Sequence, residues 1–163
     1  MKYFDVDTSV REDDKKWLID IGNNISEPAW TIRPYKLNEE EMNRISYIWK
    51  DLPVPSYAAV IMVPANTICK THVDDKAEAN GVRQRITAIN IPLAVHPTST
   101  FQYMEGEPGR YNVVDSIDLV SAKCWRVDIP HRVNNEFSPF NRVVLSLSYT
   151  ETIDEIHKRI KTS

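Results

Sequence analysis

His72 and Asp74 are separated by a single residue, and both side chains are of types that bind divalent metal ions. At the end of an extended strand, the side chains at positions i and i+2 point to the same side of the backbone. The pair could therefore present one nitrogen and one oxygen atom to the same ion. A His-x-Asp spacing also arises readily by chance, and an exposed polar tip on a turn is the open alternative.

His131 is the second histidine whose surroundings indicate chemistry. It follows the strand predicted at residues 124–129 and precedes an Asn-Asn pair that favours a turn. Taken alone, it could be a hydrogen-bonded residue at a strand end. Together with His72 and Asp74 it gives two histidines and one carboxylate, which is the facial arrangement with open positions found in non-haem Fe(II) oxygenases.

Arg142 begins the strand predicted at residues 142–150, whose alternation puts apolar side chains on one face and Arg142, Val144, Ser146 and Ser148 on the other. An arginine inside a small β-barrel is costly unless an anion meets it, because its charge loses water. A ligand carboxylate would meet this need, held by the planar guanidinium, with Ser146 adding a hydroxyl donor. A dicarboxylate bound to Fe(II) at one end and to Arg142 at the other would nearly neutralise the site. The alternative is an edge strand that leaves Arg142 in solvent.

Composition restricts the remaining possibilities. The chain of 163 residues has the size of one ordinary domain and the 42% hydrophobic content of a packed globule. The net charge is -3 and the basic residues are scattered, so no nucleic-acid partner is expected. The sequence shows none of the common nucleotide-binding loops, and neither a membrane span nor a secretion signal is expected. Cys69 and Cys124 form no CxxC motif, which favours a reduced, cytoplasmic protein.

Two regions of different character follow one another along the chain. The first part favours helices, most clearly at residues 39–50, where Asn38 and Glu41 can form a capping box, and more weakly at residues 11–21. From residue 56 onward, short β-branched and aromatic runs alternate with turn residues, and a short helix is expected at residues 152–162. The expected strands suggest an antiparallel jelly roll. They span residues 57–63, 68–72, 85–93, 100–105, 110–114, 118–120, 124–129 and 142–150.

The order of these motifs resembles the Fe(II)/2-oxoglutarate-dependent dioxygenases over residues 57–149: a His-x-Asp pair, a distal histidine, and an arginine eleven residues after that histidine. Three segments carry a closer similarity to the aspartyl/asparaginyl β-hydroxylase-like branch of this superfamily. They are VPANTICKTHVD at residues 63–74, RITAINIPL at residues 85–93, and HRVNN at residues 131–135 together with Arg142.

The resemblance implies a mainly β fold, a double-stranded β-helix of the jelly-roll, cupin-like kind, with the N-terminal helices packed on one sheet. It implies that His72, Asp74 and His131 bind Fe(II), that Arg142 holds the distal carboxylate of 2-oxoglutarate, and that Arg85 helps to hold this co-substrate. The chain departs from the branch at Thr87, where a histidine is common, and at residues 98–118, which lack glycine-rich turns.

The sequence therefore predicts one domain over residues 1–163, with an N-terminal helical layer (1–54), a catalytic core (55–150) and a C-terminal helix or tail (151–163). The expected reaction hydroxylates an unactivated C–H bond of a small molecule or of a peptide or protein side chain, releasing succinate and CO2. Loops at residues 75–84, a candidate lid, and 94–99 would help to form the pocket. The alternative function is a non-catalytic, cupin-like β-barrel that binds a metal or a dicarboxylate. Neither the substrate nor the oligomeric state follows from the sequence.

Overall fold

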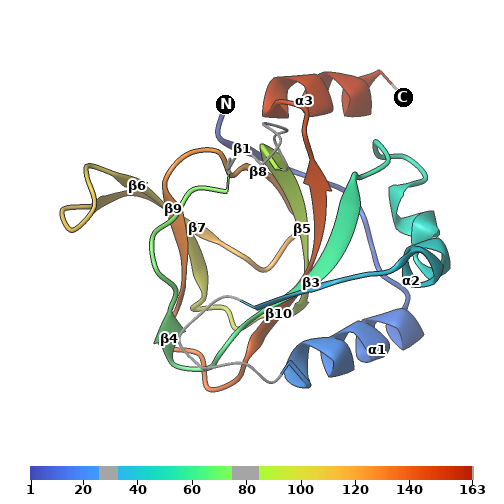
Figure 1. Ribbon diagram of the computed structural model, residues 1–163, viewed down its shortest axis with the longest axis horizontal. Helices are drawn as coiled ribbons and strands as arrows, with labels where there is room; N and C mark the ends of the chain where they lie inside the picture. Colours follow the sequence, from blue (N-terminus) through green and yellow to red (C-terminus); the bar gives the residue numbers. More distant parts are fainter. Residues whose placement is uncertain (26–32, 75–84, 163) are drawn as a thin grey trace.

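The computed structural model describes residues 1–25, 33–74 and 85–162, and in it the chain forms two antiparallel β-sheets (Figure 1). The larger sheet has the strand order β1-β8-β5-β10-β3-β2, and the smaller one has the order β4-β9-β6-β7. This mainly β arrangement is consistent with the predicted jelly roll. The strands are β1 (Tyr3–Asp5), β2 (Arg33–Lys36), β3 (Tyr57–Val63), β4 (Thr67–Ile68), β5 (Thr87–Ala94), β6 (Thr100–Glu105), β7 (Asn112–Asp118), β8 (Lys123–Arg126), β9 (His131–Asn135) and β10 (Arg142–Tyr149). The helices are α1 (Glu12–Asn23), α2 (Glu39–Arg44), the 3-10 helix η1 (Ser46–Trp49) and α3 (Ile153–Lys161).

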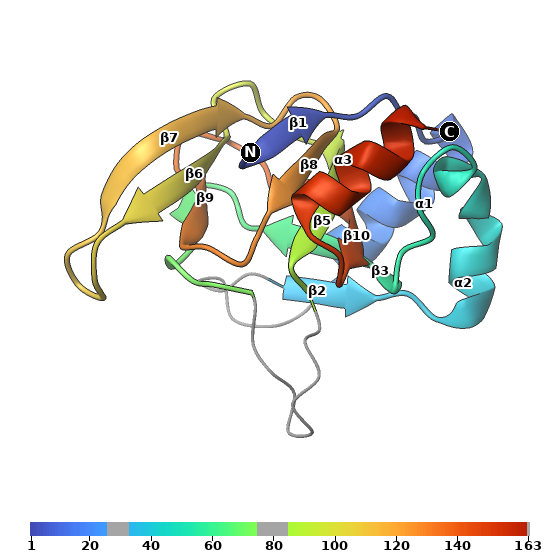
Figure 2. The ribbon, with the colours of Figure 1, turned by 90° about the horizontal axis from the view of Figure 1, so that it is seen from above.

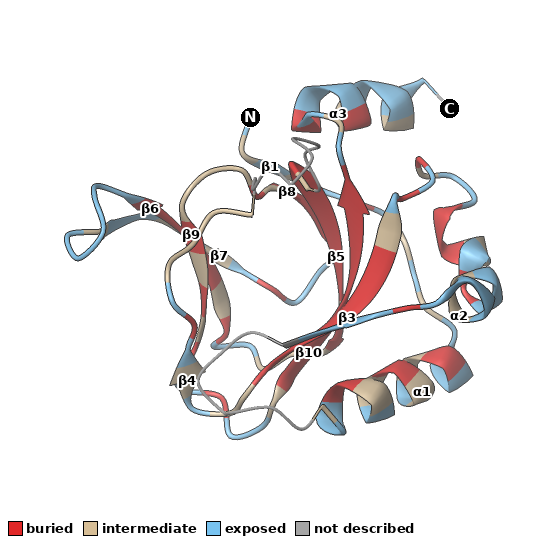
Figure 3. Ribbon diagram, in the orientation of Figure 1, coloured by how far each residue is buried: buried red, intermediate tan, exposed pale blue. Residues whose placement is uncertain are grey.

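Strand β10 lies at the centre of the larger sheet, hydrogen-bonded to β5 on one side and to β3 on the other. All of its residues are buried, and Figure 3 shows the same for most of β5 and β3. The predicted alternation holds, because Val143, Leu145, Leu147 and Tyr149 all belong to the main hydrophobic core. The opposite face of β10, which begins with Arg142, is therefore directed toward the smaller sheet.

The helices lie on the side of the larger sheet that faces away from the smaller sheet (Figure 2). Helix α1 packs beside β3, β10 and β5. A Cβ atom on Gly22 would come within 2.6 Å of a Val143 methyl carbon, so the close approach of α1 to β10 needs glycine at this position. Among the described residues, no helix combines the length and the apolar character that crossing a bilayer requires.

Residues 1–54 differ from the predicted helical layer because they also contain two strands. Strand β1 pairs with β8, and β2 pairs with β3, so both extend the larger sheet. The helix expected at residues 39–50 is divided into α2 and η1, although its capping box between Asn38 and Glu41 is present. Short strands such as β1 and β2 depend on partners far away in the chain, and local periodicity does not reveal those partners.

Strand β9 replaces the turn that was predicted at Asn134 and Asn135. Both asparagines pair with β4 on one side, and Asn134 also pairs with β6 on the other. Asparagine has a low intrinsic preference for strands, but pairing along both edges outweighs it here. The two strands expected at residues 110–114 and 118–120 are also a single strand, β7. The consequence for function is that His131 is held at the start of a paired strand.

Candidate metal centre

Backbone hydrogen bonds fix the positions of His72, Asp74 and His131. His72 and His131 form an antiparallel bridge in which each N–H donates to the other carbonyl at 3.0 Å. The N–H of Asp74 donates to the Val127 carbonyl at 2.9 Å, which ties this residue to the end of β8. Two segments that are far apart in the sequence are thereby brought together, and the structure unites the three predicted ligands in one cluster.

The ligating atoms of the cluster are close enough to share one ion. Asp74 Oδ1 lies 3.1 Å from His72 Nε2 and 3.6 Å from His131 Nε2, and one ligand atom from each residue lies within 4.8 Å of the others. Atoms that bind one ion at about 2.1 Å and at right angles lie about 3 Å apart. The spacing therefore fits a single ion with the three side chains on one side of it.

Hydrogen bonds to the backbone also orient the two imidazole rings. His72 Nδ1 lies 2.7 Å from the Lys70 carbonyl oxygen, and His131 Nδ1 lies 2.7 Å from the Ile129 carbonyl oxygen. A carbonyl only accepts, so each ring carries its proton on Nδ1. Each Nε2 is then the ring atom that faces Asp74, and it can bind a metal ion when it carries no proton.

The electrostatic environment favours the ionised carboxylate and a neutral His131. Burial alone would raise the pKa of Asp74, but the hydrogen bond from His72 and the charge of Arg85 outweigh it and lower this pKa to about 2. Burial lowers the pKa of His131 to about 4. Burial also acts to lower the pKa of His72, yet its hydrogen bonds to Asp74 and Lys70 raise it above the ordinary value. At neutral pH the cluster thus offers one carboxylate and at least one neutral imidazole.

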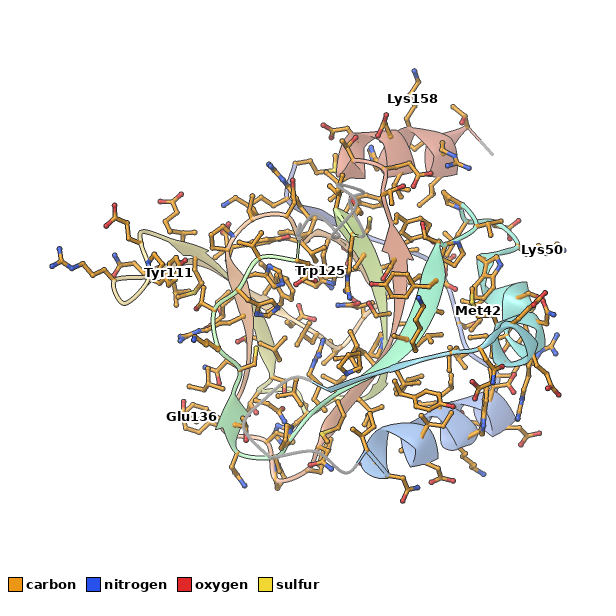
Figure 4. All side chains as sticks on the ribbon, viewed as in Figure 1. Met42, Lys50, Tyr111, Trp125, Glu136 and Lys158 are labelled. Carbon is orange, nitrogen blue, oxygen red and sulfur yellow. The ribbon has the colours of Figure 1, made fainter. Side chains whose placement is uncertain are left out.

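Aromatic side chains form the wall behind His131. The His131 ring stacks on Phe101 with 5.0 Å between centroids, and Phe101 stacks on Trp125 at 4.3 Å. Figure 4 places Trp125 between the two sheets. The indole Nε1 of Trp125 is buried without a hydrogen-bond partner among the described residues. This stack holds the His131 ring and keeps that side of the cluster dry.

Arg142 is buried inside the protein, as the alternation of β10 predicts. Only 1% of its surface is exposed, and its Nε and Nη2 atoms have no hydrogen-bond partner among the described residues. Burial lowers the pKa of the Arg142 guanidinium to about 10. A buried charge without a partner costs several kcal/mol, so this side chain is suited to an anionic ligand.

Arg85 and Ser146 lie together beside Asp74. Arg85 Nη2 donates to the Ser146 hydroxyl at 2.9 Å, and this hydroxyl donates in turn to Asn90 Oδ1 at 2.6 Å. Arg85 Nε lies 3.3 Å from Asp74 Oδ2. The Ser146 proton, expected on a ligand carboxylate, is thus directed to Asn90. Sequence reasoning missed Asn90, although a lone amide within an apolar strand was a usable signal.

Two loops are also expected from the sequence to help form the pocket. The lid expected at residues 75–84 lies outside the described residues. In the loop at residues 94–99, His96 Nδ1 lies 2.7 Å from the hydroxyl of Thr98, as in a simple turn.

Comparison with known proteins shows similarity in structure and none in sequence. No family model and no curated protein matches the chain. The carbocyclase SnoK from nogalamycin biosynthesis, described as non-heme and alpha-ketoglutarate dependent, matches with a TM-score of 0.59 and 10% identity over 96% of this chain and 85% of SnoK. The collagen prolyl hydroxylase of Paramecium bursaria Chlorella virus-1, solved as a 2-oxoglutarate complex, matches with a TM-score of 0.55 and 8% identity. The match covers 91% of this chain and 95% of the hydroxylase chain. HygX from Streptomyces hygroscopicus, solved with nickel and 2-oxoglutarate, matches with a TM-score of 0.54 and 8% identity. The match covers 93% of this chain and 84% of HygX. At these identities the comparison establishes a shared fold.

Proposed function

We propose that the chain is an Fe(II)- and 2-oxoglutarate-dependent dioxygenase that hydroxylates an unactivated C–H bond. The substrate would be a small molecule or a side chain of a peptide or protein. The observation that carries the proposal is a three-ligand cluster accompanied by Arg142, a buried arginine without an anionic partner among the described residues. The fold shared with three 2-oxoglutarate-related proteins supports it.

The donor set fits Fe(II). Two imidazole nitrogens and one carboxylate oxygen are the ligands that non-haem iron oxygenases use, and both rings direct Nε2 toward Asp74. His72, Asp74 and His131 would hold the ion. The backbone bridge between the two histidines fixes their separation before any ion binds, so little rearrangement is needed.

Arg142 fits the carboxylate end of a co-substrate. Its unpartnered Nε and Nη2 lie at the start of β10, inside the protein, where a carboxylate could accept two parallel hydrogen bonds. When bound, iron and 2-oxoglutarate would supply the oxidative chemistry, with succinate and CO2 as co-products. The residues of the chain orient the co-substrate through Arg142 and exclude water with the stack of Phe101 and Trp125.

The finer assignments rest on the sequence. Arg85, Arg142 and the segment around His72 support the aspartyl/asparaginyl β-hydroxylase-like branch, and one domain with its core at residues 55–150 is part of the same proposal. A cytoplasmic location is in keeping with Cys69 and Cys124, which are both buried and unpaired.

The proposal is tested by anaerobic titration of the purified protein with Fe(II) and 2-oxoglutarate. We expect a weak visible charge-transfer band only when both are present. His131→Ala should abolish the band. His157→Ala should preserve it, because His157 lies on α3 and its ring packs against Phe4. No band with the unmodified protein would contradict the proposal. Dicarboxylate binding that needs no metal would then favour the non-catalytic binding protein.

A further inference from the structure

The two carboxylate oxygens of Asp74 face different partners. Oδ1 is the atom that lies 3.1 and 3.6 Å from the two histidine Nε2 atoms. Oδ2 lies 3.3 Å from Arg85 Nε, an ion-pair distance at which Nε makes no hydrogen bond among the described residues, and the two side chains are 18% and 13% exposed. One oxygen is thus directed to the metal position, and the other is directed to a guanidinium.

Arg85 is itself held by the centre of the larger sheet. Its Nη2 donates to Ser146 on β10, and Ser146 donates to Asn90 on β5. These two side chains lie opposite each other in the register of the two strands, and both are buried. The Ser146 hydroxyl has one proton, and Asn90 accepts it, so the hydroxyl must accept from Arg85. The donor and the acceptor in both hydrogen bonds, from Arg85 to Ser146 and from Ser146 to Asn90, are therefore fixed.

The position of Arg85 bears on the way in which Asp74 can bind an ion. A carboxylate may bind a metal through one oxygen or through both, and the second mode uses an additional coordination position. A guanidinium beside Oδ2 stabilises the negative charge there and opposes rotation of the carboxylate toward the ion. Side chains that hold a ligand in this way are known to affect metal affinity strongly.

The geometry points to Arg85 as a positioning residue for Asp74, anchored by Ser146 and Asn90, which keeps Asp74 a one-oxygen ligand. This inference rests on the proposed function, and it gives Arg85 a different role from the co-substrate contact that the sequence suggested. Arg142 then remains the arginine available to the co-substrate carboxylate. Arg85 would then orient a metal ligand, and Arg142 would bind the co-substrate.

The first experiment measures metal binding without 2-oxoglutarate, so that a co-substrate contact cannot contribute. Mn(II) is titrated into Arg85→Gln and Arg85→Lys, and the visible spectrum of each Co(II) form is recorded. We expect Arg85→Gln to weaken Mn(II) binding about 10- to 100-fold and to change the Co(II) spectrum. Arg85→Lys keeps a charge near Oδ2 but cannot also reach Ser146 in the same way, so it should lie between Arg85→Gln and the unmodified protein.

Arg126→Gln is the matched control, because Arg126 is also ion-paired, with its Nε 2.6 Å from Asp128 Oδ1, and Asp128 is not a member of the metal cluster. Its Mn(II) affinity and Co(II) spectrum should equal those of the unmodified protein. Thermal unfolding of the metal-free variants shows whether each one is folded. If Arg85→Gln does not fold, the Mn(II) affinities of Arg85→Lys and Ser146→Ala test the positioning role instead.

The second experiment tests the anchor. Ser146→Ala should weaken Mn(II) binding less than Arg85→Gln does, and it should add nothing in the Arg85→Gln background, because it acts through Arg85. Additive losses would overturn the anchoring role. Unchanged Mn(II) affinity and an unchanged Co(II) spectrum in both Arg85 variants would overturn the positioning role, and a loss of 2-oxoglutarate affinity alone would assign Arg85 to the co-substrate. If the unmodified protein binds Mn(II) but not 2-oxoglutarate, the proposed function fails while the role of Arg85 is still decided by these titrations.

Discussion

The two faces of β10 are equally buried but differ in chemistry. The outward face packs its apolar side chains into the main core, together with residues of α1 and α3. The inward face carries Arg142 and Ser148, which retain buried polar atoms without partners among the described residues, as does Trp125 across β5. Native interiors rarely leave such atoms unpaired. The outward face therefore serves stability, whereas the unpaired polar atoms of the inward face are in keeping with the proposed ligand.

The largest expected effect comes from removing the metal-binding carboxylate. Asp74→Ala should reduce metal-dependent succinate formation to background, because the cluster then has only two imidazole ligands. Succinate assays with Fe(II) and 2-oxoglutarate measure this, and circular dichroism confirms that the variant is folded. Full turnover in the folded variant would mean that the cluster is not the reaction centre.

A cavity in the outward face should affect stability alone. Leu145 is fully buried in the main core, and Leu145→Ala should lower the free energy of unfolding by about 2–5 kcal/mol. Urea unfolding of the metal-free protein measures the loss. The Mn(II) affinity of the folded fraction should remain that of the unmodified protein. A comparable loss of metal affinity would show that the two faces are energetically coupled and would break the comparison.

Arg142→Met should give the reverse result. Removing a buried charge without a partner should leave the free energy of unfolding unchanged or raise it. The affinity for 2-oxoglutarate at saturating Mn(II) should fall by about 2 kcal/mol or more, roughly 30-fold, because a charge-assisted contact is lost. A marked loss of stability with unchanged 2-oxoglutarate affinity would assign Arg142 to the structure rather than to the ligand.

The smallest effect concerns pH, and it distinguishes the two histidines. His131, with a pKa lowered to about 4, and Asp74, with a pKa lowered to about 2, are already in their binding forms above about pH 5. His72, whose pKa is raised, must lose its proton before Nε2 can bind. Mn(II) affinity should therefore fall as pH decreases through the His72 pKa, by about tenfold per pH unit. Titrations from about pH 8 to about pH 5 test this; a hundredfold fall per unit would mean that His131 also carries a proton.

Much of the site could be predicted from the sequence. Runs of β-branched and aromatic residues predict β3, β6 and β10 nearly to the residue. Period-two alternation places Arg142 on the inward face of β10, because successive side chains of a paired strand point to opposite sides. The His-x-Asp spacing and His131 identified all three members of the cluster. These features depend on strand geometry and on residue type, and both can be read from the sequence.

Only the tertiary structure decided how the cluster is assembled. Strand β9 exists because β4 and β6 pair with it, although its own sequence favours a turn. Arg85 reaches Asp74, and Ser146 turns its proton to Asn90, because β5 and β10 bring these side chains into register. The sequence by itself determined which groups are available for chemistry, since side-chain type and strand period are local properties. Their partners were decided by contacts between distant segments, whose energies depend on the whole packed arrangement.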